Sequence, residues 1–333
     1  MNIYLAGDSI VQNYTEEEFI AGWGQFLPFF IKDGVEVVND AKGGRSSRLF
    51  INEGRFDNIE KNISAGDYLL IEFCHNDDAS KEYKTMFNRL TPLGEPDSDG
   101  RFPIIPGEAM PKDYIPPEYI DALRKDENVK DKQAVLDSVY KILESYPHDT
   151  YYPYSADGSK GTYLWFLKQF VDMAREKGAV PVFVTAPART VYDANGNIKD
   201  GAGLHGGNNF AYIRAMKQLG EEAKVPVIDL FAYSCGLYKQ IGKEKIHWIT
   251  SIKKGCNKGI WPDDFNSEMQ KKETVSEDTH FNKYGAMLIT QGLVKLIKES
   301  DSSQLDGLKG MLKNPDGIDI EKYVKKPLVF EEF

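Results

Sequence analysis

The sequence carries a serine in a position that suits nucleophilic chemistry. Ser9 follows a short apolar segment, residues 3–6, and closes the tripeptide Gly-Asp-Ser at residues 7–9. A serine at the carboxyl end of a buried strand lies where open α/β sheets bind ligands. If a helix starts there, its free N–H groups also favour developing negative charge on the serine oxygen. Ser9 is therefore a candidate nucleophile, although serine is also typical of a helix N-cap without any catalytic role.

A histidine near the other end of the chain offers the base that a serine nucleophile needs. His280 stands in the segment Glu-Asp-Thr-His-Phe, with Glu277 and Asp278 three and two residues before it. A serine hydroxyl is activated by a histidine whose tautomer is held by a carboxylate. Such a carboxylate can reach the Nδ1–H of the imidazole and leave Nε2 facing Ser9. The alternative is a histidine at a helix start whose ring bonds a backbone carbonyl.

Two further segments end in polar loops that offer hydrogen-bond donors. One, residues 37–48, contains a glycine pair ending at Gly44, and the other, residues 67–77, ends in an Asn-Asp turn that begins at Asn76. A tetrahedral acyl intermediate requires donors aimed at its oxyanion. The backbone N–H groups of Ser9 and Gly44 and the side-chain amide of Asn76 are candidates for this role. Individually, each is an ordinary loop residue.

Taken together, these four blocks resemble the SGNH hydrolase superfamily, and within it the rhamnogalacturonan acetylesterases. The resemblance spans almost the whole chain and implies a serine esterase with a three-layer α/β/α, flavodoxin-like fold and no cofactor. It implies that Ser9 is the nucleophile and His280 the general base, and that Ser9, Gly44 and Asn76 form the oxyanion hole. The matching segments are Gly-Asp-Ser at residues 7–9 with Gln12, Asn-Asp-Ala at 39–41 leading to Gly-Arg-Ser at 44–46, Phe73 with His-Asn-Asp at 75–77, and Thr-His-Phe at 279–281 ahead of Gly-Ala at 285–286.

The chain departs from the family pattern at two positions. The family has an aspartate three residues before the histidine, where this chain has Glu277. Glutamate carries the same charge and recurs in hydrolase triads, so we favour Glu277 over Asp278 as the acid that orients His280. The second departure is Cys74, where the family usually has glycine. If that position requires a positive φ or a close approach, cysteine would strain the oxyanion loop and favour an inactive relative.

The order of apolar segments predicts an α/β protein. We expect one domain, residues 1–333, built on a central parallel sheet of about five strands with helices on both faces. Helices are expected in the intervals between strands and at residues 286–298. The predicted strands lie near residues 2–6, 35–38, 68–73, 180–185 and 226–229.

Two insertions, at about residues 79–160 and 238–274, interrupt this alternation, and a tail covers about residues 301–333. Long loops at the catalytic edge of a rigid sheet usually hold specificity. The first insertion begins with a proline-rich loop and continues into a charged helical segment around residues 119–143. The tail contains an apolar segment, residues 327–330, that we expect to dock on the body or on a partner subunit.

Aromatic and arginine side chains are candidates for substrate binding. Aromatic rings stack on the apolar faces of sugars, and arginine pairs with the carboxylate of a uronate. The alternative for each ring is to fill a small core beneath a long loop, which is the more common use of an aromatic residue. The candidates are Arg45, Arg189, Trp248 and Trp261, with Arg48, Tyr151, Tyr152 and Tyr154 as further options.

Composition argues against several classes of function. A formal charge of −10 with no basic stripe argues against a nucleic-acid partner. The five histidines are scattered, so we expect no metal site, and no apolar run approaches the length of a membrane span. Three cysteines without close pairing favour free thiols, and no leader precedes the first strand. We therefore expect a cytoplasmic protein, although a secreted protein without its leader would have the same sequence.

The sequence thus predicts a serine esterase that removes O-acetyl groups from an acetylated oligosaccharide, with pectin-derived fragments as the first expectation. An acetyl xylan esterase, or a lipase or thioesterase that prefers longer acyl chains, would use the same residues. A carbohydrate-binding pseudoenzyme with a spoiled oxyanion loop is the alternative from another class. The oligomeric state is not predicted by any of these features.

Overall fold

A five-stranded parallel sheet forms the centre of the protein. The computed structural model describes residues 1–15, 20–78, 89–199, 208–252 and 276–324. The strand order is β2-β1-β3-β6-β7, and every neighbouring pair is parallel. This confirms the predicted α/β fold, with strand ends within two residues of the predicted ones. The strands are β1 (Ile3–Gly7), β2 (Val37–Asn39), β3 (Tyr68–Glu72), β6 (Val180–Val184) and β7 (Val227–Ile228).

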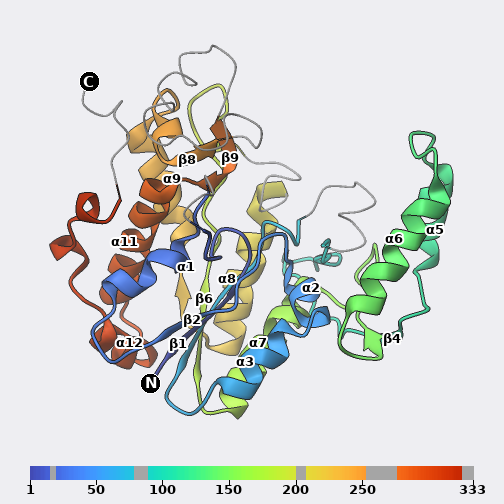
Figure 1. The fold of residues 1–333 in the computed structure, drawn as a ribbon, viewed down its shortest axis with the longest axis horizontal. Coiled ribbons are helices and arrows are strands. Elements are labelled where there is room, and N and C mark those ends of the chain that lie inside the picture. Colours follow the sequence, from blue (N-terminus) through green and yellow to red (C-terminus); the bar gives the residue numbers. More distant parts are fainter. Residues whose placement is uncertain (16–19, 79–88, 200–207, 253–275, 325–333) are drawn as a thin grey trace.

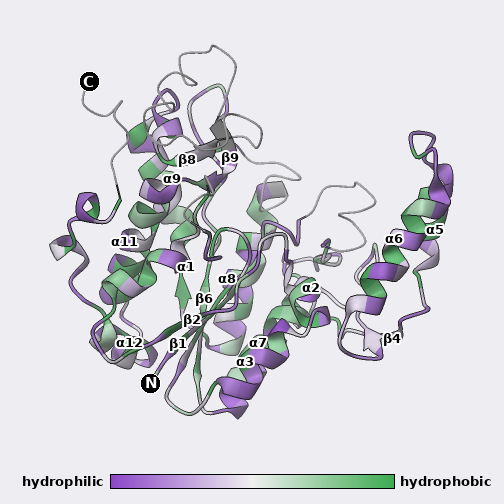
Figure 2. Ribbon diagram, in the orientation of Figure 1, coloured by the Kyte–Doolittle hydropathy of each residue, from purple (hydrophilic) through white to green (hydrophobic). Residues whose placement is uncertain are grey.

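Successive residues of the central strands point to opposite faces of the sheet. Ile3 and Leu5 belong to one apolar cluster, while Tyr4 and Ala6 belong to another. Because both faces are covered, β1 and β3 are buried at every position. The central strands are accordingly coloured as hydrophobic along much of their length in Figure 2.

Helices cover both faces of this sheet (Figure 1). Apolar side chains that pack on the first face come from α1 (Trp23–Phe26), α9 (Leu230–Ile241), α11 (Lys283–Glu299) and α12 (Asp306–Met311). Those that pack on the second face come from α2 (Ser47–Asn52), α3 (Arg55–Asn62), α7 (Tyr163–Glu176) and α8 (Ala211–Ala223). Short 3-10 helices complete the fold: η1 (Leu27–Phe30), η2 (Asn208–Phe210), η3 (Ile246–Trp248), η4 (Ser303–Leu305), η5 (Pro315–Gly317) and η6 (Ile320–Lys322).

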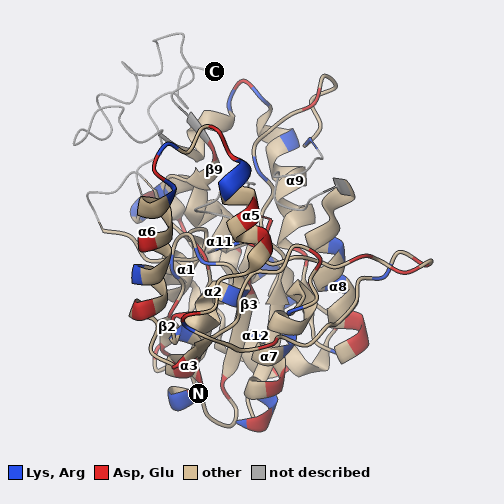
Figure 3. Ribbon diagram, turned by 90° about the vertical axis from the view of Figure 1, so that its right-hand side faces the viewer, with Lys and Arg blue, Asp and Glu red and all other residues tan. Residues whose placement is uncertain are grey.

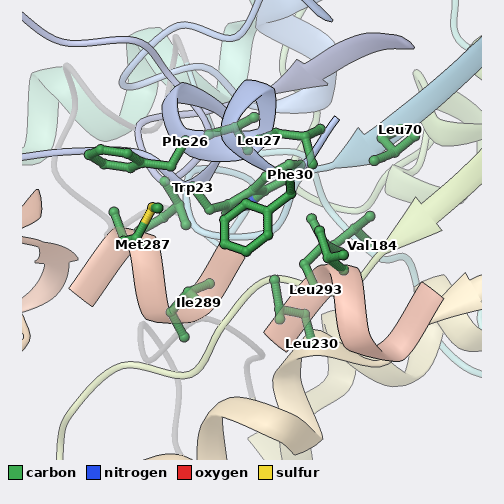
Figure 4. Close-up of a cluster of buried hydrophobic side chains, with 14 of the residues drawn as sticks. Trp23, Phe26, Leu27, Phe30, Leu70, Val184, Leu230, Met287, Ile289 and Leu293 are labelled. Carbon is green, nitrogen blue, oxygen red and sulfur yellow. The ribbon is translucent and has the colours of Figure 1, made fainter. Parts of the chain in front are cut away.

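The largest apolar cluster lies between the sheet and α11. Trp23, Phe30 and Leu293 are completely buried there, and their side chains converge in Figure 4. The hydroxyl of Thr290 on α11 donates to the Trp23 carbonyl at 2.8 Å, which fixes α1 against α11. Because α1 follows the Ser9 loop and α11 follows His280, this cluster joins the two segments that carry the candidate catalytic residues.

Leu293→Ala should therefore lower the free energy of unfolding by about 2–5 kcal/mol, because it leaves a cavity in a fully buried layer. Urea denaturation followed by circular dichroism measures the loss. Lys295→Ala, at an exposed position of the same helix, is the matched control and should change stability by less than about 0.5 kcal/mol. An equal effect of the two substitutions would contradict the packing described here.

The first insertion forms a small lobe with its own core. It holds β4 (Met110–Pro111), α5 (Pro117–Lys125), α6 (Lys132–Ser145) and β5 (Thr150–Tyr151), and Figure 1 shows α5 and α6 projecting away from the sheet. The single helical segment predicted at residues 119–143 is wrong, because the chain breaks into two helices. Asp131 caps the second one by accepting from the Ala134 N–H at 2.9 Å.

The segment around His280 forms a strand, which the sequence did not predict. β9 (Ser276–Phe281) pairs antiparallel with β8 (Thr250–Ile252), and α11 starts directly afterwards. α11 begins three residues earlier than predicted because the Asn282 side chain accepts from the Gly285 N–H at 2.8 Å. A Cβ on Gly285 would lie 2.0 Å from the Ile249 carbonyl oxygen, so only glycine allows this approach.

The tail after α11 packs against the body. Leu308, Leu312 and Ile320 join the core on the α11 side of the sheet. The apolar segment at residues 327–330, for which docking is predicted, lies outside the described residues. No helix in the described part of the chain is long and apolar enough to span a membrane. Lys and Arg are interspersed with Asp and Glu over the side shown in Figure 3.

Candidate active site

Ser9 lies on a turn at the carboxyl end of β1 and not at a helix N-terminus. The Asp8 carboxylate accepts from the Ile10 N–H at 2.9 Å, and the Asp8 carbonyl accepts from Val11 and Gln12. The expected helix start is therefore replaced by a turn that Asp8, rather than Ser9, stabilises with its side chain. The Ser9 hydroxyl is thus not used as a cap.

His280 reaches Ser9 across almost the whole length of the chain. The distance from His280 Nε2 to Ser9 Oγ is 2.8 Å, although the two residues are 271 positions apart. The main chain after His280 is held on two sides: the Phe281 carbonyl accepts from the Ala21 N–H at 2.9 Å, and the Asn282 side chain donates to the Trp248 carbonyl at 2.7 Å. The structure therefore brings together a serine hydroxyl and an imidazole in the geometry of proton transfer.

Of the two acids before His280, the structure describes the side chain of Asp278 but not that of Glu277. The Asp278 carboxylate accepts from the Thr279 hydroxyl at 2.8 Å and lies 3.8 Å from Arg189 Nη1. Its side chain is 47% exposed, so these contacts lie at the surface. The backbone of Glu277 belongs to β9, while its side chain lies outside the described part of the structure. Asp278 is thus engaged by Thr279 and Arg189.

The glycine pair of the second block lies against Ser9. A Cβ on Gly43 would lie 3.4 Å from the Ser9 Cβ, and the Gly43 N–H donates to Gln12 Oε1 at 2.5 Å. Gly44 has a φ of +80°, a backbone conformation that glycine adopts without strain. Gly43 thus lies beside the serine, and Gly44 follows it in the same loop.

Asn76 is held beside Ser9 by Asp8. Its Nδ2 donates to Asp8 Oδ2 at 2.9 Å, and both side chains are buried. An amide nitrogen carries two hydrogens, so one of them satisfies Asp8 and the second remains available for a substrate oxygen. The structure therefore places Ser9, Gly44 and Asn76 around the same turn.

Cys74 does not strain the loop that carries Asn76. Among the described residues, positive φ values outside glycine occur only at Asn209, Phe210 and Lys224. The Cys74 side chain is buried in the apolar cluster on the α7 side of the sheet, and burial raises the pKa of its thiol well above the usual value. The strain considered for a cysteine at this position is therefore absent, and the thiol is an inert core residue.

A group of buried carboxyls lies directly beneath the candidate site. Glu72 is fully buried at the end of β3, and neither of its carboxyl oxygens has a hydrogen-bond partner within the described chain. Burial, with repulsion from Asp8 and Asp77, raises the pKa of Glu72 well above its ordinary value. Burial also raises the pKa of Asp8 to about 6 and that of Asp77 to about 7. Glu72 is therefore held in the neutral, protonated form.

Glu72→Gln should change how stability depends on pH. Because folding raises the pKa of Glu72, its contribution is fully present below the ordinary pKa of 4.5 and is lost as the pH rises toward the folded-state value. The variant cannot ionise here, so its stability relative to the wild type should increase steadily with pH. Urea denaturation at a series of pH values, with the exposed Glu176→Gln in parallel, measures this trend. A stability difference that is constant across the series, or that falls with pH, would contradict a buried neutral Glu72.

The predicted substrate-binding residues differ in their surroundings. Arg45 is engaged by Glu53 through two hydrogen bonds of 2.8 and 2.7 Å, and Arg189 lies beside Asp278. Trp248 is 6% exposed and belongs to the apolar core, so its ring presents no open face to a sugar. Trp261 lies outside the described residues.

The other residues that the sequence offers for substrate binding mainly pack in the core or hold segments of the chain together. Arg48 is buried and donates to the carbonyls of Tyr152 and Leu90, which ties α2 to the first insertion. Tyr151 and Tyr154 are buried, as the core alternative predicts. Tyr152 packs edge-to-face on Trp165.

One residue beside the site was not found by sequence reasoning. Arg89 Nη1 lies 3.4 Å from Asn76 Oδ1, and a Cβ on Gly44 would lie 3.0 Å from Arg89 Nη2. Arg89 lies in the first insertion, ahead of Leu90 and Thr91. Neither spacing nor a neighbouring motif distinguishes it from the other arginines of the chain, so only the fold reveals its position.

The combination of fold and site defines a class of protein. A parallel α/β sheet carries a serine–histidine pair at the carboxyl ends of its strands, with a glycine loop and an asparagine amide beside the serine. This is the arrangement of a serine hydrolase that forms an acyl-enzyme.

Comparisons with known proteins agree with this class. The chain is 30% identical over 300 residues to the rhamnogalacturonan acetylesterase RhgT of Bacillus subtilis, covering 90% of both proteins. It is 30% identical over 299 residues to the probable rhamnogalacturonan acetylesterase YesY of the same organism, covering 90% of this chain and 93% of the relative. No family model matches the chain. These relatives show that the chain belongs to the rhamnogalacturonan acetylesterase group of the SGNH hydrolase superfamily, and it is therefore a carboxylic ester hydrolase.

A solved structure supports the fold independently. The crystal structure of the YxiM protein of Bacillus subtilis superposes with a TM-score of 0.51 at 20% sequence identity. The superposition covers 91% of this chain and 57% of that chain, so this chain spans little more than half the length of that protein. At this level of identity the likeness concerns the fold alone.

Proposed function

We propose that the protein is a serine esterase that removes O-acetyl groups from pectin-derived rhamnogalacturonan fragments. The observation that carries the chemistry is the 2.8 Å contact between Ser9 Oγ and His280 Nε2 beside the Gly44 loop and Asn76. The substrate class is supported by the relatives named as rhamnogalacturonan acetylesterases, which match along nine-tenths of the chain.

The first half-reaction forms an acetyl-enzyme. His280 Nε2 accepts the Ser9 proton while Ser9 Oγ attacks the acetyl carbonyl, and the carbonyl oxygen becomes an oxyanion. The backbone N–H groups of Ser9 and Gly44 and the second N–H of Asn76 donate to that oxyanion. Collapse of the tetrahedral intermediate breaks the bond to the sugar oxygen, which takes the proton from His280 and leaves as an alcohol.

The second half-reaction releases acetate. Water gives a proton to His280 Nε2 and attacks the acetyl carbonyl of Ser9. The same donors hold the second oxyanion, and the proton on His280 returns to Ser9 Oγ as acetate leaves. We assign Glu277 as the acid that holds the His280 tautomer, because it occupies the position of the family's aspartate and because Asp278 is engaged by Thr279 and Arg189.

Ser9→Ala and His280→Ala should each lower kcat for p-nitrophenyl acetate by at least about 10³-fold, because the pair acts as a unit. The double variant should be no slower than the slower single variant by more than about threefold. Steady-state kinetics measures these losses. His148→Ala, which removes an exposed histidine paired with Asp57, is the control. Full activity in Ser9→Ala would sink the assignment of the nucleophile.

Glu277→Gln should lower kcat by about 10²–10⁴-fold, while Asp278→Asn should lower it by less than about tenfold. The reason is that only a carboxylate facing the imidazole stabilises the charge that forms on it. The same ester assay at saturating substrate distinguishes the two variants. A larger loss in Asp278→Asn would exchange the roles of the two acids.

The substrate class is tested by acetate release from acetylated pectin fragments and from acetylated xylan fragments. Release from pectin fragments that depends on Ser9 is the expected result. Release from xylan alone would make the protein an acetyl xylan esterase with the same mechanism. A preference for octanoyl over acetyl esters would favour a lipase or thioesterase, and sugar binding without any release would favour a pseudoenzyme.

A further inference from the structure

Arg89 lies over the residues that we assign to the oxyanion hole. Its Nη1 is 3.4 Å from Asn76 Oδ1. A Cβ on Gly44 would lie 3.0 Å from Nη2 and 3.3 Å from Cζ of the same guanidinium. The guanidinium therefore covers both Gly44 and Asn76, the two residues whose N–H groups would surround the reacting carbonyl.

The main chain holds Arg89 in this place. Thr91, two residues later, donates its N–H to the Asp77 carbonyl at 3.0 Å and its hydroxyl to the Arg89 carbonyl at 3.1 Å. The Thr91 carbonyl in turn accepts from the Tyr212 hydroxyl at 2.8 Å. Asp77 is the residue directly after Asn76, so Arg89 and the oxyanion loop are anchored to each other. The main chain that carries the guanidinium is thus fixed by the fold.

The charge on Arg89 is poorly compensated. Within the described chain, no carboxylate lies at ion-pair distance from its guanidinium, and its hydrogen bond to Asn76 is long. By contrast, Arg45 is fully engaged by Glu53. Burial and the nearby Arg45 lower the pKa of Arg89, and the attraction of Asp8 offsets this only in part. A guanidinium in this state favours an anionic ligand, and its fork of donors matches a carboxylate.

We propose that Arg89 binds a carboxylate of the substrate, placing an acidic sugar beside the acetyl group that is removed. This inference rests on the proposed function and assigns the uronate contact to Arg89 rather than to Arg45 or Arg189. Because Arg89 lies against Gly44 and Asn76, the carboxylate belongs to the acetylated sugar or to its immediate neighbour. Arg89 is thus a specificity-determining residue that recognises galacturonate-type sugars by their charge.

A binding measurement tests this without relying on turnover. The probes are an unacetylated rhamnogalacturonan oligosaccharide and its carboxyl-reduced, neutral form, titrated by calorimetry into wild type, Arg89→Gln and Arg89→Lys. We expect wild type to prefer the acidic form, Arg89→Gln to bind it at least about tenfold more weakly, and Arg89→Lys to retain part of the affinity as a point charge without the fork. Arg101→Gln, which removes an exposed arginine paired with Glu222, is the matched control and should bind as wild type does.

Two outcomes would overturn the proposal. One is equal affinity of wild type for the acidic and neutral forms, and the other is unchanged affinity in a folded Arg89→Gln variant. If Arg89→Gln does not fold, the Arg89→Lys variant and the comparison of the two probes on wild type still decide the matter. Absence of acetate release by wild type would instead refute the proposed function. A preference for the acidic probe would then reflect binding alone and would have no connection with catalysis.

Kinetics on the wild-type protein and its variants separates recognition from catalysis. With acetylated fragments, Arg89→Gln should raise KM more for the acidic form than for the carboxyl-reduced form. An equal loss of kcat on both forms and on p-nitrophenyl acetate would show that Arg89 acts on the oxyanion donors, and this would contradict a role in binding the carboxylate.

Discussion

The contact between Ser9 Oγ and His280 Nε2 joins the two ends of the candidate site and can form only if several distant elements are placed correctly. The two residues are 271 positions apart, and the contact is 2.8 Å. It requires β1 to end at the correct height in the sheet and β9 to reach over that edge. The first requirement is met by the register of β1 with β2 and β3, and the second by the hydrogen bonds of Phe281 and Asn282 and by the packing of α11 on α1. An esterase site is thus assembled from the two ends of the described chain by a common core.

Three carboxyls, those of Asp8, Glu72 and Asp77, are buried next to the Ser9 turn. Asp8 holds both the Ser9 turn and the Asn76 amide, but its burial next to Glu72 and Asp77 raises the pKa of all three carboxyls. The cluster therefore stays partly protonated, which lowers the charge repulsion under the nucleophile. Arg89, on the other side of Asn76, adds a positive charge where a substrate would lie. The cluster thus carries less negative charge than three ionised carboxylates would, while Arg89 carries a positive charge on the other side of Asn76.

Much of this arrangement could be predicted from the sequence, because local patterns determine it. β1, β3 and β6 are five-residue apolar strands, and their carboxyl ends meet at one edge of any parallel sheet. That rule is enough to gather Ser9 and Asn76. Gly44 was identifiable from the glycine pair in the loop after β2 and from the family resemblance. The helix after His280 was predicted from its apolar period, and only its first turn was missed because the cap is formed by an asparagine side chain.

The remaining features depend on tertiary contacts that no local pattern encodes. The antiparallel pair β8–β9 joins residues 250–252, within the second predicted insertion, to the segment that carries His280. Trp248 is amphipathic, and only the packing of α11 and its neighbours decides that its ring is buried. Nothing in the sequence around Arg89 distinguishes it from the other arginines. Its position over Gly44 depends on the hydrogen bond from the Thr91 N–H to the Asp77 carbonyl.

The central claim is that Ser9 carries the acyl group. Mass spectrometry of the wild-type protein, quenched with acid during turnover of an acetyl ester and then digested, tests this most directly. We expect one added acetyl group on the peptide that contains Ser9, and none on that peptide in the Ser9→Ala variant. Acetate release with the acetyl group on another residue, or with no covalent intermediate while Ser9→Ala stays active, would contradict it.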